Sequence, residues 1–138
     1  MKFSSDLGDL VELQPRFAPG DADLALTVHV FRDGFLGDIQ TWVARHDWFA
    51  FAQALGVLEQ RRTGEANLQS MSPGELKLTV KSLDRAGHLG IEGAIARREF
   101  DREIELRFSI IPFEASQLVE FTKEAWQVSE ALGERGAT

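Results

Sequence analysis

The chain has 138 residues, 43% apolar and 27% charged, which suits one folded domain and excludes an intrinsically disordered chain. Its 15 basic and 22 acidic residues give a formal net charge of −7, which disfavours direct binding to nucleic acid and suits either solubility alone or a basic protein partner. The absence of cysteine excludes disulfides, thiolate nucleophiles and cysteine-based zinc sites.

The first residues, Met1 to Asp6, lack the apolar stretch of a signal peptide. No apolar run approaches the length needed to span a membrane. We therefore expect a cytoplasmic protein that forms a single domain over residues 1–138 and does not associate with membranes.

Alternating apolar and polar residues predict three strands in the first part of the chain, over residues 9–17, 23–31 and 36–44. Pro15 places the first of them at a sheet edge, because proline has no N–H to donate. Pro19-Gly20 and Asp33-Gly34 predict the connecting turns. In the third strand this register puts Trp42 on the face opposite Ile39.

A helix is predicted to begin at His46-Asp47, with the Asp47 carboxylate as its N-cap, and to end near Arg61–Gly64. Its apolar residues lie on one stripe, at Trp48, Phe51, Ala52, Leu55 and Leu58. Gly56 inside this helix suggests a close approach to a neighbouring backbone.

The second part of the chain predicts a short strand over 66–69 and longer strands over 75–83, 88–96 and 103–111. Leu83 is out of phase with Val80, which suggests a bulge near Ser82. The segment Arg97–Glu99 is predicted as a turn, and Pro112 as the end of the last strand. A final helix is expected over 115–132, followed by a frayed tail over 133–138.

This order of elements indicates an α+β fold with two layers. We expect one antiparallel sheet of about six to seven strands, with both helices packed on one face. The other face is expected to be open to solvent and to carry Glu12, Gln14, Arg16, Lys77, Thr79, Lys81, Glu92, Glu103, Glu105 and Arg107.

No catalytic motif is recognisable in the sequence. The three histidines, His29, His46 and His88, do not have the spacing of metal ligands. Glu103 and Glu105 share a strand face but are expected to be solvated, so they do not suggest an acid–base pair. We therefore predict no catalytic, cofactor-binding or metal-binding residue, and no cofactor.

Two surfaces are candidates for binding a protein partner. His29, Phe31 and Trp42 would share the outer face near the first hairpin, unless a loop or a shifted register buries them. Glu120, Glu124 and Glu130 lie on the last helix, where like charges one turn apart are unfavourable and a cationic partner would offset that cost. A simply solvated acidic face is the alternative.

Several motifs occur in an order that resembles the WapI-like immunity proteins of bacteria. These motifs are Trp48-Phe49-Ala50-Phe51 at a helix start, the hairpin segment Gly87-His88-Leu89-Gly90-Ile91, and the strand Glu105-Leu106-Arg107-Phe108-Ser109-Ile110, which precedes a helix with Leu118 and Phe121. The resemblance spans roughly residues 8 to 132. It implies a cytoplasmic protein without catalytic activity that neutralises a toxin domain by binding it, and it assigns no interface residue.

Two other functions stay open at this point. The first is a small-ligand-binding domain or an enzyme, whose site would lie between the sheet and the helices. The second is an oligomeric structural module that pairs open sheet faces. The sequence leaves the oligomeric state and the identity of any partner undetermined.

Overall fold

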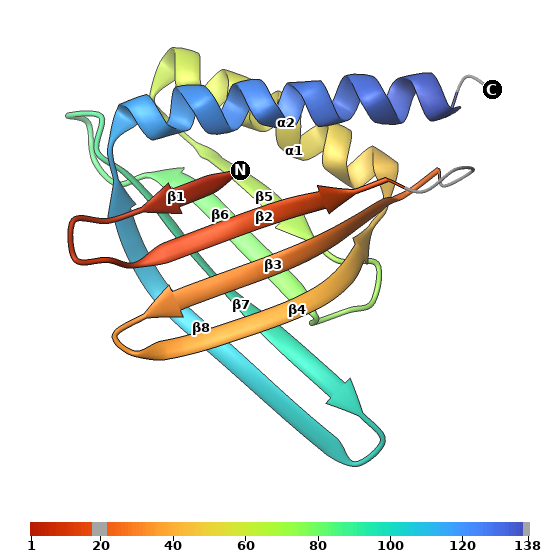
Figure 1. The fold of residues 1–138 in the computed structure, drawn as a ribbon. Coiled ribbons are helices and arrows are strands. Elements are labelled where there is room, and N and C mark those ends of the chain that lie inside the picture. Colours follow the sequence, from red (N-terminus) through yellow and green to blue (C-terminus); the bar gives the residue numbers. More distant parts are fainter. Residues whose placement is uncertain (18–21, 137–138) are drawn as a thin grey trace.

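Two four-stranded antiparallel sheets form the body of the molecule, each followed in the chain by a helix (Figure 1). The computed structural model describes residues 1–17 and 22–136. The first sheet and its helix consist of β1 (Lys2–Ser4), β2 (Leu10–Arg16), β3 (Leu24–Arg32), β4 (Phe35–Val43) and α1 (Arg45–Arg61). The second sheet and its helix consist of β5 (Glu65–Gln69), β6 (Leu76–Ser82), β7 (Leu89–Glu99), β8 (Arg102–Phe113) and α2 (Ala115–Gly136).

The strands of the two sheets cross, one sheet lying over the other, and both helices run along the same side of this pair (Figure 1). The α+β class is confirmed. The prediction of one sheet of six to seven strands with two helices on one face is wrong, because the structure has eight strands in two sheets. Alternation shows that one face of a strand is covered, but it does not distinguish a covering helix from a covering sheet.

The short strand β1 was not predicted, and it changes the position of β2. Lys2 pairs with Glu12 and Phe3 with Val11, so β2 has neighbours on both sides over its first residues. Pro15 lies beyond this pairing and contacts only β3 along the ladder. The edge position predicted from Pro15 therefore holds only for the second half of β2.

An aromatic cluster joins both sheets and both helices. The ring of Phe3 stacks on Phe113 of β8 and on Phe121 of α2, with centroid distances of 4.1 and 4.2 Å. Phe121 also meets Phe51 of α1 edge to face at 6.3 Å, and Phe51 meets Trp48 at 5.5 Å. All five side chains are buried, so this cluster is the place where the four parts of the molecule share one core.

The start of α1 differs from the prediction. The N-cap residue is Ala44, which has no side chain that can cap the helix, and Asp47 lies in the first turn. The carboxylate of Asp23, just before β3, instead accepts a hydrogen bond of 3.1 Å from the Arg45 N–H. The atoms nearest to Gly56 belong to the Trp126 indole of α2 rather than to a neighbouring backbone.

Strands β7 and β8 are longer than predicted. Arg97–Glu99 belong to β7, and the turn consists of Phe100 and Asp101. Pro112 does not end β8, because β8 is an edge strand on which a missing N–H is tolerated. The irregularity in pairing lies between Ile91 and Gly93 rather than near Ser82, and beyond it Ile111 is buried.

The final helix continues to Gly136, so the predicted frayed tail is wrong for residues 133–136. Residues 137–138 lie outside the described part of the chain, as does the turn predicted at Pro19-Gly20.

Truncation of Phe3 tests whether the aromatic cluster holds the four parts together. We expect Phe3→Ala to lower the free energy of unfolding by about 4 kcal/mol, because a fully buried ring is removed from two stacked neighbours. Denaturant unfolding measures the change. The matched control is Phe35→Ala, whose ring is 68% exposed and whose loss is expected to cost less than about 0.5 kcal/mol. Equal effects of the two variants would contradict the assignment.

Candidate functional site

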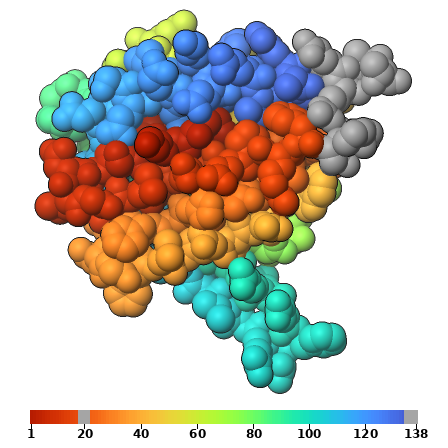
Figure 2. Space-filling model, viewed as in Figure 1, coloured from red at the N-terminus to blue at the C-terminus, as the bar shows by residue number. Residues whose placement is uncertain are grey.

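The most prominent surface feature is the end of the β7–β8 hairpin, which projects from the body on the side away from the helices (Figures 1 and 2). Strand β6 begins at Leu76, whose partner in β7 is Ile95. Beyond this pair β7 and β8 continue as a two-stranded ribbon, here defined as residues 96–105. Every residue from Arg97 to Glu105 is exposed, so most of the ribbon is available for contact with another molecule.

Two arginines attach the base of the ribbon to the body. Arg97 donates a hydrogen bond of 3.1 Å to the Asp38 carbonyl of β4. Arg98 donates one of 2.9 Å to the Pro73 carbonyl and lies 3.1 Å from a carboxylate oxygen of Glu103. Successive strand residues point to opposite faces, so the two arginines hold the ribbon from both sides.

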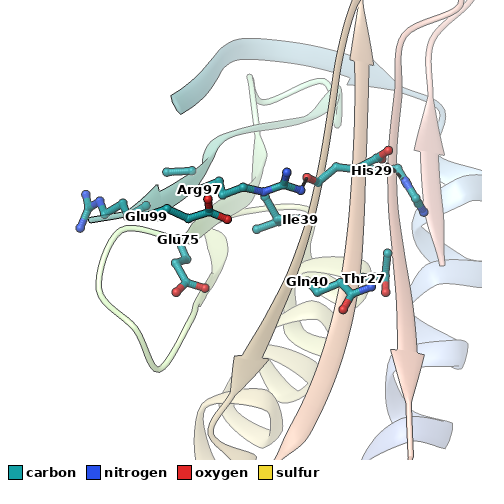
Figure 3. Close-up of a pocket in the computed structure, with 10 residues that line it drawn as sticks. Thr27, His29, Ile39, Gln40, Glu75, Arg97 and Glu99 are labelled. Carbon is teal, nitrogen blue, oxygen red and sulfur yellow. Dashed lines mark hydrogen bonds and ion pairs between the residues drawn. The ribbon is translucent and has the colours of Figure 1, made fainter. Parts of the chain in front are cut away.

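A polar groove lies on one side of β4 and has a volume of about 480 Å³ (Figure 3). The imidazole Nδ1 of His29 pairs there with the Asp38 carboxylate, its direct cross-strand neighbour. Glu75 accepts a hydrogen bond of 2.9 Å from the Thr41 hydroxyl. Within the described residues no hydrogen bond joins the Thr27 hydroxyl to His29, so the groove has an oriented histidine but no nucleophile aligned with it.

A second, more apolar groove lies where the start of β4 crosses the base of the ribbon, and it also has a volume of about 480 Å³. The two strands approach closely because Gly37 has no side chain; a Cβ there would lie 2.8 Å from Ile95 Cδ1 and 2.9 Å from Leu106 Cδ2. Phe35, Leu36 and Ile104 line this groove and are 68%, 68% and 72% exposed.

Phe31 adjoins this groove, because it is the cross-strand partner of Leu36. We call Phe31, Phe35, Leu36 and Ile104 the apolar rim. Soluble proteins seldom expose large apolar side chains in a group unless the group contacts another molecule. The apolar rim is therefore a candidate for contact with a partner.

At the tip of the ribbon, Phe100 is fully exposed and has a backbone φ of +48°. A left-handed conformation costs an L-residue roughly 1–2 kcal/mol, and two-residue hairpin turns normally place glycine at such a position. Strain of this kind is concentrated at functional sites. An exposed phenylalanine kept in a strained turn thus marks the tip as a second candidate contact.

The sequence pattern does not mark Phe35, Leu36, Phe100 or Ile104 as contact residues. One signal was present, because Phe100 is a single aromatic residue within a run of charged ones. Alternation placed Ile104 with the core-facing residues, but the ribbon carries it beyond the body and leaves it exposed.

The first predicted surface is on the outer face of the sheet but is divided. His29 and Phe31 lie near the β3–β4 turn, and Phe31 is part of the apolar rim. Trp42 is 45% exposed and pairs with Ala25, at the far end of the same two strands. The structure therefore does not bring Trp42 together with the other two residues.

The second predicted surface, on α2, is far from the ribbon (Figure 1). Glu120 and Glu130 are exposed. Glu124 lies 3.2 Å from the amino group of Met1, so its charge is already paired within the chain. This contact makes Glu124 a weaker candidate for binding a cationic partner.

Asp84 is the one described residue with a clearly shifted pKa, and it lies in the loop at the other end of β7. The hydrogen bond from the His88 side chain, at 2.6 Å, lowers the pKa of Asp84, and the backbone N–H groups of His88 and Ala86 add to the effect. This geometry gives His88 and Asp84 a role in shaping the turn.

Other kinds of site find little support in the described residues. Within residues 1–17 and 22–133, no three His, Asp or Glu side chains are grouped as metal ligands would be. Neither described helix combines the length and the apolar character that a membrane-spanning helix needs. Comparisons with protein-family models, curated proteins and solved structures gave no match for the chain.

The strain at Phe100 predicts an unusual order of stabilities. We expect Phe100→Gly to be more stable than Phe100→Ala by about 1 kcal/mol, because only glycine adopts a positive φ without cost. Thermal or denaturant unfolding of both variants measures the difference. Asp101→Gly and Asp101→Ala are the control pair, because the neighbouring residue is not among those with positive φ and alanine is expected to be the more stable there. A more stable alanine variant at position 100 would show that the turn is unstrained.

Proposed function

We propose that this protein works by binding another protein, without catalysing a reaction, and that the ribbon tip and the apolar rim contact the partner. The observation that carries the proposal is Phe100, which a strained turn holds fully exposed at the end of a projecting hairpin. Aromatic side chains that enter a pocket of a partner supply much of the binding energy in protein interfaces. The apolar rim, to which the ribbon contributes Ile104 and the strands β3 and β4 contribute the other residues, lies beside the ribbon and extends the contact.

The distribution of charge supports a division of roles between the ribbon and the body. Residues 96–105 contain three arginines and four acidic residues, so the ribbon is nearly neutral, whereas the whole chain carries a net charge of −7. Most of the negative charge therefore belongs to the body. An acidic body would accelerate the approach of a basic partner, and the apolar contacts of the ribbon would then slow its release.

In its specific form, the proposal is that the partner is a bacterial toxin domain. The resemblance to WapI-like immunity proteins supports this form, as does the acidity that suits a basic target. Binding would then neutralise the toxin by covering or distorting its active site. The alternative of a small-ligand or enzymatic site between sheet and helices has less support, because Trp48, Phe51 and Phe121 fill that space.

The test first examines the adjacent genes for a toxin domain, and then uses that domain in a growth-protection assay and a binding titration. The wild-type protein is expected to restore growth. Phe100→Ala is expected to weaken binding about 30-fold, as for a central aromatic contact worth about 2 kcal/mol. Val57→Ala, which truncates an apolar α1 residue that is 42% exposed, is the matched control and is expected to bind like the wild type.

Two results would contradict the proposal at different levels. Unchanged binding by Phe100→Ala would remove the ribbon tip from the interface. The absence of an adjacent toxin gene, together with a lack of protection on co-expression, would overturn the toxin-specific form.

A further inference from the structure

Strand β8 leaves one edge of the second sheet unpaired over several residues. The strand order β5-β6-β7-β8 places β8 at the margin of that sheet. Near its middle, the Arg32 guanidinium donates a hydrogen bond to the Ser109 carbonyl and so occupies the edge there. Within the described chain, no further backbone hydrogen bond reaches the outer side of residues 102–108. This segment is therefore free to pair with another strand.

The pairing of β7 with β8 determines which backbone groups point outward. The two-residue turn is closed by Glu99 and Arg102, and the pairs then alternate between hydrogen-bonded and non-hydrogen-bonded ones. Glu103, Glu105 and Arg107 fall at the non-hydrogen-bonded positions, so their N–H and C=O groups face away from β7. Ser109 lies two residues beyond Arg107, so its carbonyl is also expected to face outward. The hydrogen bond that this carbonyl accepts from Arg32 agrees with the assignment.

Within one chain the Arg107 guanidinium pairs with the Glu105 carboxylate. The order of charges along the free edge lets a second copy of the same strand form these pairs between the chains instead. In an antiparallel pair centred on Leu106, Glu105 of each copy lies opposite Arg107 of the other. All four of these residues would present outward backbone groups to one another, which provides four hydrogen bonds between the copies. Opposite charges facing each other across strands are favourable, and like charges are unfavourable.

Other registers in which the outward N–H and C=O groups of the two strands still face each other are less favourable. A pair centred on Glu105 sets this residue against its own copy, and this repulsion offsets part of the gain from the two Glu103–Arg107 pairs that the same register forms. A pair centred on Ile104 sets Glu103 against Glu105 twice, and one centred on Arg107 sets two arginines together. Charges on an edge strand normally prevent association. Here the order of the signs, negative at Glu103 and Glu105 and positive at Arg107, disfavours the shifted registers and permits one.

We propose that two copies of this chain associate through the free edges of their β8 strands, antiparallel and centred on Leu106. The association extends the second sheet across a two-fold axis and pairs residues 104–108 of each copy, ending before Arg32 reaches Ser109. It also covers Ile104, which is 72% exposed in the single chain. An interface of five residues from each copy is small, so the dimer is expected to be weak and dependent on concentration.

Analytical ultracentrifugation of the purified full chain over a range of concentrations is the direct test. The mass is expected to rise from monomer towards dimer as the concentration increases. Amide hydrogen exchange at Glu105 and Arg107 is expected to slow in parallel, since those N–H groups become hydrogen-bonded. A purely monomeric chain at about 1 mM, where a Kd of about 1 mM would still pair half of the chains, would overturn the proposal.

Charge reversal tests the register. The charge variants all carry Glu103→Gln, because an acidic residue at position 103 would face a new arginine at position 105 in the register centred on Ile104. In this background Glu105→Arg alone places arginine opposite arginine, and Arg107→Glu alone places glutamate opposite glutamate, so each variant is expected to be monomeric. The double variant restores opposite charges in this register only and is expected to recover the dimer. Both side chains lie on an exposed face, and thermal melting at low concentration, where the dimer is dissociated, verifies that each variant is folded. A dimeric single variant, or a folded but monomeric double variant, would contradict the proposed pairing.

This inference does not rest on the proposed function, although the dimer would cover Ile104, which belongs to the apolar rim. Phe100 lies outside the paired segment, so Phe100→Ala is expected to dimerise like the wild type. Equal binding of a partner to the wild type and to a monomeric charge variant would not contradict the dimer. A chain that fails to dimerise would overturn only the dimer, and the role of the ribbon tip would still be decided by the binding of Phe100→Ala.

Discussion

The contact of Phe3 with Phe113 and Phe121 is the interaction on which the rest of the structure depends. Strand β1 has only three residues, yet it closes the first sheet and places one ring between the second sheet and α2. The Gln117 side chain reinforces the junction, since it accepts a hydrogen bond from the Ser4 N–H at 2.7 Å and donates one to the Ser4 carbonyl at 2.9 Å. This junction lies on the side of the molecule that carries both helices (Figure 1). The ribbon therefore extends without contacts to them on the opposite side.

The crossing of β4 over the second sheet sets the position of the candidate site. Gly37 allows β4 to lie directly against Ile95 and Leu106, so β7 and β8 pass beneath the first sheet and emerge beyond it. Arg97 and Arg98 then fix the direction in which the ribbon leaves the body. The exposed tip is thus attached to a well-packed core, which reduces the entropy that it loses when a partner binds.

The sequence predicted the ends of most strands to within two residues. Each of these strands buries one face, and its apolar and polar residues therefore alternate clearly. It did not predict β1, since Lys2–Ser4 is too short to show a period, nor the turn at Phe100, since Phe-Asp is not a typical turn sequence. It also did not predict the two-sheet arrangement or the rim around Ile104. Those features depend on how far β8 extends beyond the strands that cover it, and local alternation contains no information about that distance.

The hydrogen bonds between Ser4 and Gln117 join positions that are 113 residues apart in the chain. During translation, β1 to β4 emerge from the ribosome with the apolar inner face of the first sheet uncovered, because the strands and the helix that cover it have not yet been made. The domain therefore acquires its complete core only after α2 has been synthesised, and its folding is expected to be slow for its size. Until then the nascent chain presents an apolar sheet surface, which is the kind of surface that chaperones recognise.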